Sequence, residues 1–196
     1  QLRMALVGRP RGDYAISTDD NGDRLAAAGV NTVLVGTTGG DTLIGNTGLD
    51  LLFGHEGSDN LQGGLGEDLL VGGAGNDTLD GGDDLDTLVG GADNDTYVDD
   101  TGEDIIVELT TGGTDTVETL AATYTLVGKA NVENLEYTGA DADPFAGTGN
   151  ELNNVLIGNT GNNRLYGLAG NDTLTGNQGN DLLDGGSGND AMTGNA

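Results

Sequence analysis

Large apolar residues recur every nine residues along most of the chain. They form two series, Leu43, Leu52, Leu61, Leu70, Leu79, Leu88, Tyr97 and Ile106, and then Leu156, Leu165, Leu174, Leu183 and Met192. In the nonapeptide 72–80, Thr78 and Asp80 point to one face of the expected strand and Leu79 to the other, which is the two-residue period of a β-strand. The preceding Gly-Gly-Ala-Gly-Asn-Asp favours tight turns, because Gly and Asn adopt left-handed conformations at little cost. Each nonapeptide is therefore predicted to be a turn and a short strand with one inward side chain.

A nine-residue period is too short for helix pairs or propeller blades, and it suits half a coil of a parallel β-solenoid. The predicted fold class is therefore all-β. Residues 32–35 look like the first coil strand, and eight nonapeptides follow in 36–107. The two apolar series are 50 residues apart from Ile106 to Leu156, which is not a multiple of nine. The register is thus predicted to break between two arrays.

This register divides the chain into four predicted parts. Residues 1–30 are a cap or the end of a preceding domain, 31–107 form the first array, 108–148 a spacer without the consensus, and 149–196 a second, truncated array. The spacer contains strand-like runs at 115–119, 123–127 and 132–137, which predict wider coils, with a flexible linker as the alternative. In 1–30, residues 2–7 and 14–17 could be strands and 19–23 a turn. The last three residues begin another nonapeptide, so the natural protein is expected to continue.

Acidic residues occupy the sixth place of most repeats. The first array has Asp41, Asp50, Asp59, Asp68, Asp77, Asp86, Asp95 and Asp104, and the second has Asn154, Asn163, Asp172, Asp181 and Asp190. The formal net charge is −27 and only 35% of residues are hydrophobic, a composition typical of disorder unless something neutralises the charge. The chain has 25 Asp but 8 Glu, and a bias to the shorter carboxylate is typical of turns and of oxygen-ligand metal sites.

Stacked half-coils would place repeats n and n+2 on one edge, about 4.8 Å apart. Two adjacent turns then supply two carboxylates and several carbonyl oxygens, a set of hard ligands that selects Ca²⁺ over Mg²⁺ or Zn²⁺. The chain has no cysteine, which excludes disulfides and thiolate metal sites, and six Lys and Arg make nucleic acid an unfavourable partner. No apolar run has transmembrane length, and no zinc-protease, serine-hydrolase or nucleotide-binding motif is present. The chain itself is therefore expected not to be an enzyme.

The repeats resemble those of the RTX, or haemolysin-type, calcium-binding family, whose consensus is G-G-x-G-x-D-x-U-x. Residues 63–71, 72–80 and 185–193 match it in full, whereas 81–89 and 90–98 differ at the fourth place, Asp84 and Asp93. The resemblance implies a right-handed parallel β-roll. It also implies calcium ligation by the position-six side chains named above and by the carbonyls of positions two and four. Those carbonyls are expected at Gly64, Gly66, Gly73, Gly75, Gly82, Asp84, Gly91, Asp93, Gly186 and Gly188.

Pairing repeat n with n+2 predicts about nine calcium sites, six in the first array and three in the second. The sites that begin at Asn154 and Asn163 are expected to be weaker, because an amide replaces a carboxylate. Nine divalent ions would reduce the formal net charge from −27 to about −9. The metal-free chain is therefore expected to be unfolded or molten, with calcium supplying folding free energy that a narrow core cannot.

The resemblance also implies a secreted or surface-exposed bacterial protein that passes unfolded through a type I secretion channel and folds in extracellular calcium. One alternative is an accessory module of a secreted protease, lipase or alginate epimerase, chaperone-like toward an adjacent domain of the same chain or able to hold a polysaccharide. Another is a calcium-stiffened adhesin or surface-layer segment. His55 is interpreted as a solvated turn residue, and the integrin-type tripeptide 11–13 as a chance match near a turn. The additional acids beside the ligand positions, such as Asp99, are interpreted as solvated, with support of the ligands as the alternative.

Overall fold

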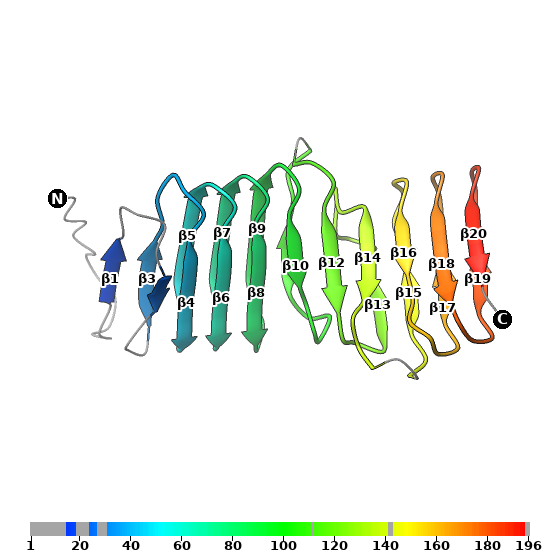
Figure 1. Cartoon of the computed structure of the whole chain (residues 1–196), viewed down its shortest axis with the longest axis horizontal. Coiled ribbons are helices and arrows are strands. Elements are labelled where there is room, and N and C mark those ends of the chain that lie inside the picture. Colours follow the sequence, from blue (N-terminus) through cyan, green and yellow to red (C-terminus); the bar gives the residue numbers. More distant parts are fainter. Residues whose placement is uncertain (1–14, 19–23, 27–30, 111, 141–142, 195–196) are drawn as a thin grey trace.

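The computed structural model describes residues 15–18, 24–26, 31–110, 112–140 and 143–194. Within these ranges the chain forms twenty short strands and no helix, stacked in an elongated ladder from the blue N-terminal end to the red C-terminal end (Figure 1). The described residues thus contain no helix that could span a membrane. The all-β prediction is confirmed.

Strands of the first array alternate between two sheets, and most have six residues. They are β3 (Thr32–Val35), β4 (Thr42–Thr47), β5 (Leu51–Glu56), β6 (Asn60–Leu65), β7 (Leu69–Ala74), β8 (Thr78–Asp83), β9 (Thr87–Ala92), β10 (Thr96–Val98) and β11 (Ile105–Val107). The later strands are β12 (Thr116–Thr119), β13 (Thr123–Thr125), β14 (Asn134–Tyr137), β15 (Ala146–Thr148), β16 (Val155–Ile157), β17 (Arg164–Tyr166), β18 (Thr173–Asn177), β19 (Leu182–Asp184) and β20 (Ala191–Gly194).

Every strand pair is parallel, and in the first array the paired residues are 18 positions apart, as in Leu43 with Leu61 and Leu52 with Leu70. This offset confirms that repeat n stacks on repeat n+2. With the N-terminal strands β1 (Ala15–Thr18) and β2 (Arg24–Ala26) included, the order β2-β4-β6-β8-β10-β12-β14-β16-β18-β20 forms one ten-stranded sheet. The opposite face has a six-stranded sheet, β1-β3-β5-β7-β9-β11, and a four-stranded sheet, β13-β15-β17-β19. The chain is therefore a parallel β-roll.

The break in the nine-residue register interrupts only one face of the roll. On that face the six-stranded sheet ends at β11 and a new sheet begins at β13. On the other face, Tyr97 pairs with Val117, Val117 with Leu135 and Leu135 with Leu156. The offsets between these pairs are unequal, and longer turns absorb the irregular spacing. The spacer strands are coils of the same roll, while the four-part domain division stays a prediction.

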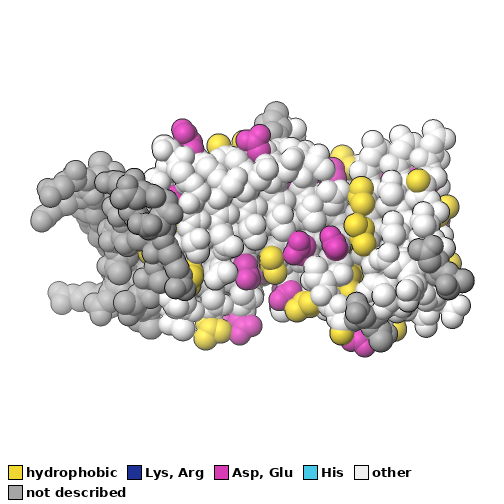
Figure 2. Space-filling model, viewed as in Figure 1, with side chains coloured by type: hydrophobic (Ala, Val, Ile, Leu, Met, Phe, Trp, Pro, Cys, Tyr) yellow, Lys and Arg dark blue, Asp and Glu magenta, His cyan; other side chains and the backbone are white. Residues whose placement is uncertain are grey.

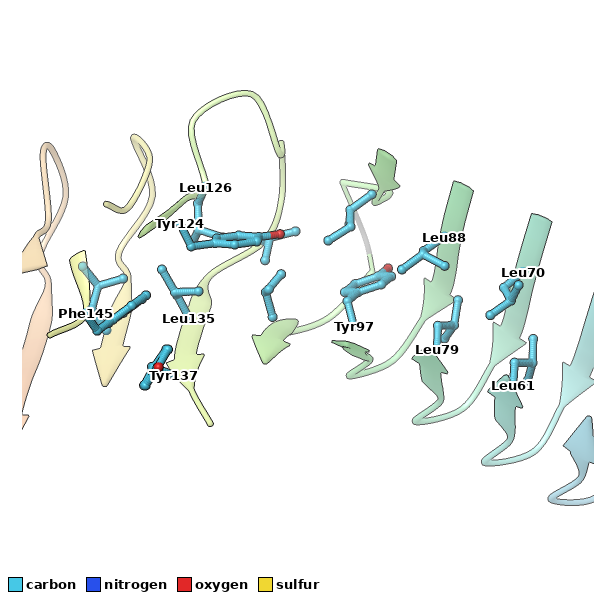
Figure 3. Packing of buried hydrophobic residues seen from close by; sticks show 14 of the residues in the cluster. Leu61, Leu70, Leu79, Leu88, Tyr97, Tyr124, Leu126, Leu135, Tyr137 and Phe145 are labelled. Atoms are coloured by element: carbon cyan, nitrogen blue, oxygen red, sulfur yellow. The ribbon is translucent and has the colours of Figure 1, made fainter. Parts of the chain in front are cut away.

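The core is a column of inward side chains between the two faces. Leu61, Leu70, Leu79 and Leu88 point toward one another from alternate sheets (Figure 3), and each is 0% exposed. Burying one such side chain contributes about 1.5–3 kcal/mol. The spacer coils use larger residues, and the rings of Tyr137 and Phe145 stack with centroids 4.8 Å apart.

Met192 keeps the predicted inward register, paired with the buried Leu174, but it is 51% exposed. Its strand β20 pairs only with β18 among the described residues, so no further coil covers the methionine there. Leu183, one repeat earlier, is half-buried for a similar reason.

Two strands of the N-terminal part join the roll. The strand β1 (Ala15–Thr18) pairs with β3, and β2 (Arg24–Ala26) pairs with β4. A strand predicted at 14–17 therefore lies within one residue of β1. The predicted strand at 2–7, the turn at 19–23 and the tripeptide 11–13 lie outside the described residues.

Candidate metal sites

In most of the nonapeptides, the glycine-rich segment holds two left-handed residues separated by one other residue. In repeat 72–80 these are Gly73 with φ 124° and Gly75 with φ 116°, the second and fourth places. A Cβ atom at either glycine would collide with a backbone carbonyl of the turn stacked beside it, that of His55 or of Gly57. Glycine therefore lets successive turns approach closely and present their carbonyl oxygens along the edge of the roll.

Non-glycine residues take the same backbone conformation at the departures from the consensus. Asp84 has φ 81° and Asp93 has φ 74°, and His55 at the second place of its repeat has φ 84°. Asp and Asn tolerate this region better than most residues, because their short polar side chains bond locally. The carbonyls predicted as ligands at Asp84 and Asp93 thus lie in turns of the repeat geometry, and the His55 side chain is exposed, as predicted.

The position-six aspartates form a hydrogen-bonded ladder along each edge. From Asp41 to Asp86, the backbone N–H of each donates to Oδ1 of the aspartate 18 residues later, for example Asp41 to Asp59 at 2.7 Å and Asp68 to Asp86 at 2.7 Å. The same bond links Asn154 to Asp172, Asn163 to Asp181 and Asp172 to Asp190. Adjacent turns of one edge are therefore joined through the residues predicted to bind metal.

The ladder continues into the spacer through two residues that the sequence reasoning missed. The N–H of Asp95 donates to Oδ1 of Asp115 at 2.8 Å, and the N–H of Asp115 donates to Oε2 of Glu133 at 2.9 Å. Both acids precede a strand by one position, as the repeat aspartates do. Asp115 and Glu133 do not follow the nine-residue period, because the step from Asp95 to Asp115 is longer and no full glycine-rich turn precedes either acid.

The other carboxylate oxygen of these aspartates is buried and has no hydrogen-bond donor. Such oxygens belong to Asp41, Asp50, Asp59, Asp68, Asp77, Asp86, Asp95, Asp115, Asp172 and Asp181. A buried carboxylate oxygen without a partner is unfavourable, which suits a site completed by a cation. The first-place glycine leaves the space open. A Cβ at Gly45 would lie 2.5 Å from the unpartnered Oδ2 of Asp50 and against the carbonyl oxygen of Gly63.

Burial changes the protonation of these carboxyl groups. Desolvation raises the pKa of Asp95 to about 8 and that of Asp68 to about 7, with the neighbouring acids of the stack adding to the shift and a backbone hydrogen bond opposing it. Desolvation likewise raises the pKa of Asp77 to about 6 and that of Asp104 to about 7. The metal-free roll therefore disfavours its own charged aspartates near neutral pH.

The two asparagines at position six behave differently. Nδ2 of Asn163 donates to the carbonyl oxygens of Asn159, Gly161 and Gly176, at 3.0, 2.9 and 2.9 Å. Asn159 and Gly161 are the second and fourth places of that repeat, whose carbonyls were predicted to hold calcium. Nδ2 of Asn154 donates to the carbonyl oxygen of Glu133 at 3.0 Å. At Asn163 the amide NH₂ group thus bonds to carbonyl oxygens whose counterparts in the aspartate repeats are predicted to bind calcium.

The expectation that Asp99 is solvated is wrong. Asp99 is 0% exposed and accepts hydrogen bonds from the Tyr124 hydroxyl at 2.6 Å and from the Gly102 N–H at 2.7 Å. Nζ of Lys129 lies 3.6 Å from its Oδ2 and donates to the carbonyl oxygen of Asp104 at 2.9 Å. A lysine ammonium therefore stands beside the last aspartate of the first array. These partners are far apart in the chain and follow no period, so no sequence pattern indicates their contact.

On the face drawn in Figure 2, acidic side chains lie at separate places rather than in one continuous patch. The remaining predicted glycine ligands have the expected conformation, with φ 115° at Gly64, 112° at Gly66, 98° at Gly82 and 121° at Gly91. In the second array φ is 88° at Gly186 and 145° at Gly188. Ligation by these residues stays a prediction.

Comparison with known proteins supports the geometric interpretation. The family described as the RTX calcium-binding nonapeptide repeat matches residues 35–70, 62–97, 148–183 and 166–196. These matches together cover more than half of the chain. No curated protein matches it significantly. Parallel coils, glycine turns, stacked aspartates and the family match all lead to one assignment: the chain belongs to the RTX calcium-binding nonapeptide repeat family.

Proposed function

We propose that this β-roll folds when calcium binds its stacked aspartates, and that this occurs outside the cell after secretion in an unfolded state. The observation that carries the proposal is the set of buried carboxylate oxygens without donors, such as Oδ2 of Asp59, Asp77 and Asp95. Each would lose its hydration on folding and gain nothing in return unless a cation completes its coordination.

The energetics favour a switch rather than a permanently folded module. The core is one inward side chain wide per strand, and at neutral pH the metal-free roll must desolvate carboxylates that carry negative charge. Calcium bound between two carboxylates and several carbonyls replaces the lost hydration and links consecutive turns. Extracellular modules bind calcium at about 10⁻⁴–10⁻³ M, far above the calcium level of the cytosol, so the same sites would stay empty before export.

Circular dichroism of the full chain tests the proposal. With a chelator the spectrum should be that of a coil, and adding millimolar calcium should produce β-structure cooperatively, whereas magnesium at the same concentration should produce little. A β-rich spectrum that is unchanged by chelator would overturn it. The accessory-module and adhesin alternatives stay predictions, because each concerns partners of the module rather than its folding.

A further inference from the structure

Three acidic side chains meet where the first array joins the spacer. Asp95 precedes β10, Glu108 follows β11 and Asp115 precedes β12, and one carboxylate oxygen of each lies within 4.8 Å of the other two. Among the described residues this is the single group of three acids, or of acids with His or Cys, that meets so closely. Glu108 and Asp115 both lie outside the residues that the repeat family matches.

The cluster is buried, and its carboxylates have no basic side chain beside them among the described residues. Asp95, Glu108 and Asp115 are 1%, 8% and 0% exposed, and Oδ2 of both aspartates has no hydrogen-bond donor. Within the described part of the chain the one ion pair joins Lys129 to Asp99, so none of the three carboxylates pairs with a basic side chain there. Three carboxylates in so little solvent repel one another strongly, and a divalent cation is the ligand that removes this cost.

The surrounding residues fix Glu108 in place. The Tyr97 hydroxyl donates to its Oε1, and the N–H of Leu109 donates to its Oε2 at 2.9 Å. Tyr97 itself is held in the core beside Leu79 and Leu88 (Figure 3). A carboxylate oriented by such donors is preorganised for coordination.

Two glycines leave room for the cluster. A Cβ at Gly90 would lie 2.5 Å from Oε1 of Glu108 and against Oδ2 of Asp95. A Cβ at Gly112 would lie 3.2 Å from Oδ2 of Asp115 and 3.1 Å from the carbonyl oxygen of Leu109. The space therefore offers the oxygens of three acids and one neighbouring carbonyl, which are ligands of the kind that calcium takes.

We propose that Asp95, Glu108 and Asp115 bind one calcium ion outside the nonapeptide pattern, more tightly than the two-carboxylate sites of the repeats. This site belongs to the proposed calcium-dependent folding, and the choice of calcium as its metal rests on that proposed function. Calcium affinity rises with the number of charged ligands, and this site has three where a repeat site has two. The ion would fill first and tie β10, β11 and β12 together at the point where one sheet ends.

Isothermal titration of the full chain with calcium separates this site from the others. The variant Glu108→Gln keeps the size and hydrogen-bond acceptor of the side chain but removes its charge, and Glu103→Gln makes the same change at an exposed position in the preceding turn. Glu108→Gln should lose the tightest binding event or weaken it at least tenfold, while Glu103→Gln keeps it. Equal titrations of Glu108→Gln and the unchanged chain would overturn the inference. An unchanged chain that binds no calcium would instead contradict the proposed function.

Terbium, which replaces calcium and emits when excited through a nearby tyrosine, gives a measurement that does not depend on folding of the Glu108 variant. The first equivalent of terbium added to the full chain should emit strongly, and Tyr97→Phe, which keeps the buried ring, should reduce that emission by more than half. The matched variant Tyr166→Phe, on β17, should not. First-equivalent emission that is the same in Tyr97→Phe as in the unchanged chain would show that the ion binds elsewhere.

Discussion

The backbone N–H of Asp77 donates a 2.8 Å hydrogen bond to Oδ1 of Asp95, in the turn stacked on its own edge. The two side chains are 2% and 1% exposed, and Oδ2 of each has no donor. Each carboxylate thus connects two turns with one oxygen and offers the other to a cation. An aspartate in the middle of the ladder therefore contributes to the calcium sites on both sides of it, and its removal should weaken two sites.

Replacement of Asp77 tests this sharing. Asp77→Ala should reduce the calcium stoichiometry by up to two ions and raise the calcium concentration at the folding midpoint, because the ladder loses one acceptor and two sites lose a carboxylate. Calorimetric titration and circular dichroism measure the two quantities. Asp83→Ala removes an exposed acid of the next turn and should leave both nearly unchanged. An unaltered stoichiometry for Asp77→Ala would refute the pairing of n with n+2.

Replacement of Asn163 by Asp adds a carboxylate to the ladder, whereas Asp77→Ala removes one. Asn163→Asp removes the NH₂ group that bonds to the Asn159, Gly161 and Gly176 carbonyls and puts a carboxylate beside them. The variant should bind one more calcium ion than the unchanged chain. Without calcium it should be less stable, since a buried carboxylate replaces a satisfied amide. Titration that finds no additional ion would show that these carbonyls do not form a latent site.

Protonation should partly replace calcium. The pKa of Asp68 is raised to about 7 and that of Asp95 to about 8, from 3.8 in the unfolded chain, so the folded state binds more protons between about pH 4 and pH 8. The free energy of unfolding of the metal-free roll should therefore fall as pH rises through this window. Calcium affinity should rise over the same range, because fewer protons compete.

Circular dichroism in chelator, compared between about pH 8 and pH 4.5, measures this effect. The acidic sample should have more β-structure or a higher thermal midpoint, and the calcium-loaded sample should show the opposite trend, losing affinity in acid. Metal-free stability that increases with pH would contradict the assignment of buried, desolvated aspartates.

Lys129 should stabilise the end of the first array. Its side chain is 14% exposed and its ammonium group lies beside the fully buried Asp99, so Lys129→Met leaves that acid without its counter-charge. Breaking such a pair costs about 3 kcal/mol, which denaturation in saturating calcium can measure. The double variant Lys129→Met with Asp99→Asn should recover most of the loss. If it recovers nothing, the lysine acts through packing alone.

The nine-residue apolar pattern was sufficient to predict strands, inward residues and the stacking of alternate repeats. Leu52 and Leu70 lie where the pattern places them, because each repeat is one turn and one strand with little freedom to differ. The edge aspartates followed from the same register. The exposure of Met192 could not be predicted, since a repeat pattern does not state whether a further coil covers the strand.

Features of the spacer could not be predicted, because they depend on distance in space rather than on period. Asp115 continues the ladder after a longer step than the repeats take, and Glu108 reaches it from the opposite sheet. The partners Asp99 and Lys129 are distant in the chain, and no repeat period relates them. Asn163 was expected to be a weak calcium ligand, but its amide NH₂ group bonds to the carbonyl oxygens that a calcium ion would contact. These hydrogen bonds could not be predicted from the sequence.

A crystal structure of the full chain grown with calcium, with anomalous diffraction used to locate the ions, tests calcium ligation most directly. We expect anomalous peaks along both edges of the roll, each about 2.3–2.6 Å from a buried aspartate oxygen such as Oδ2 of Asp77. Aspartates buried in the same ladder without anomalous peaks beside them would contradict the claim that calcium completes their coordination.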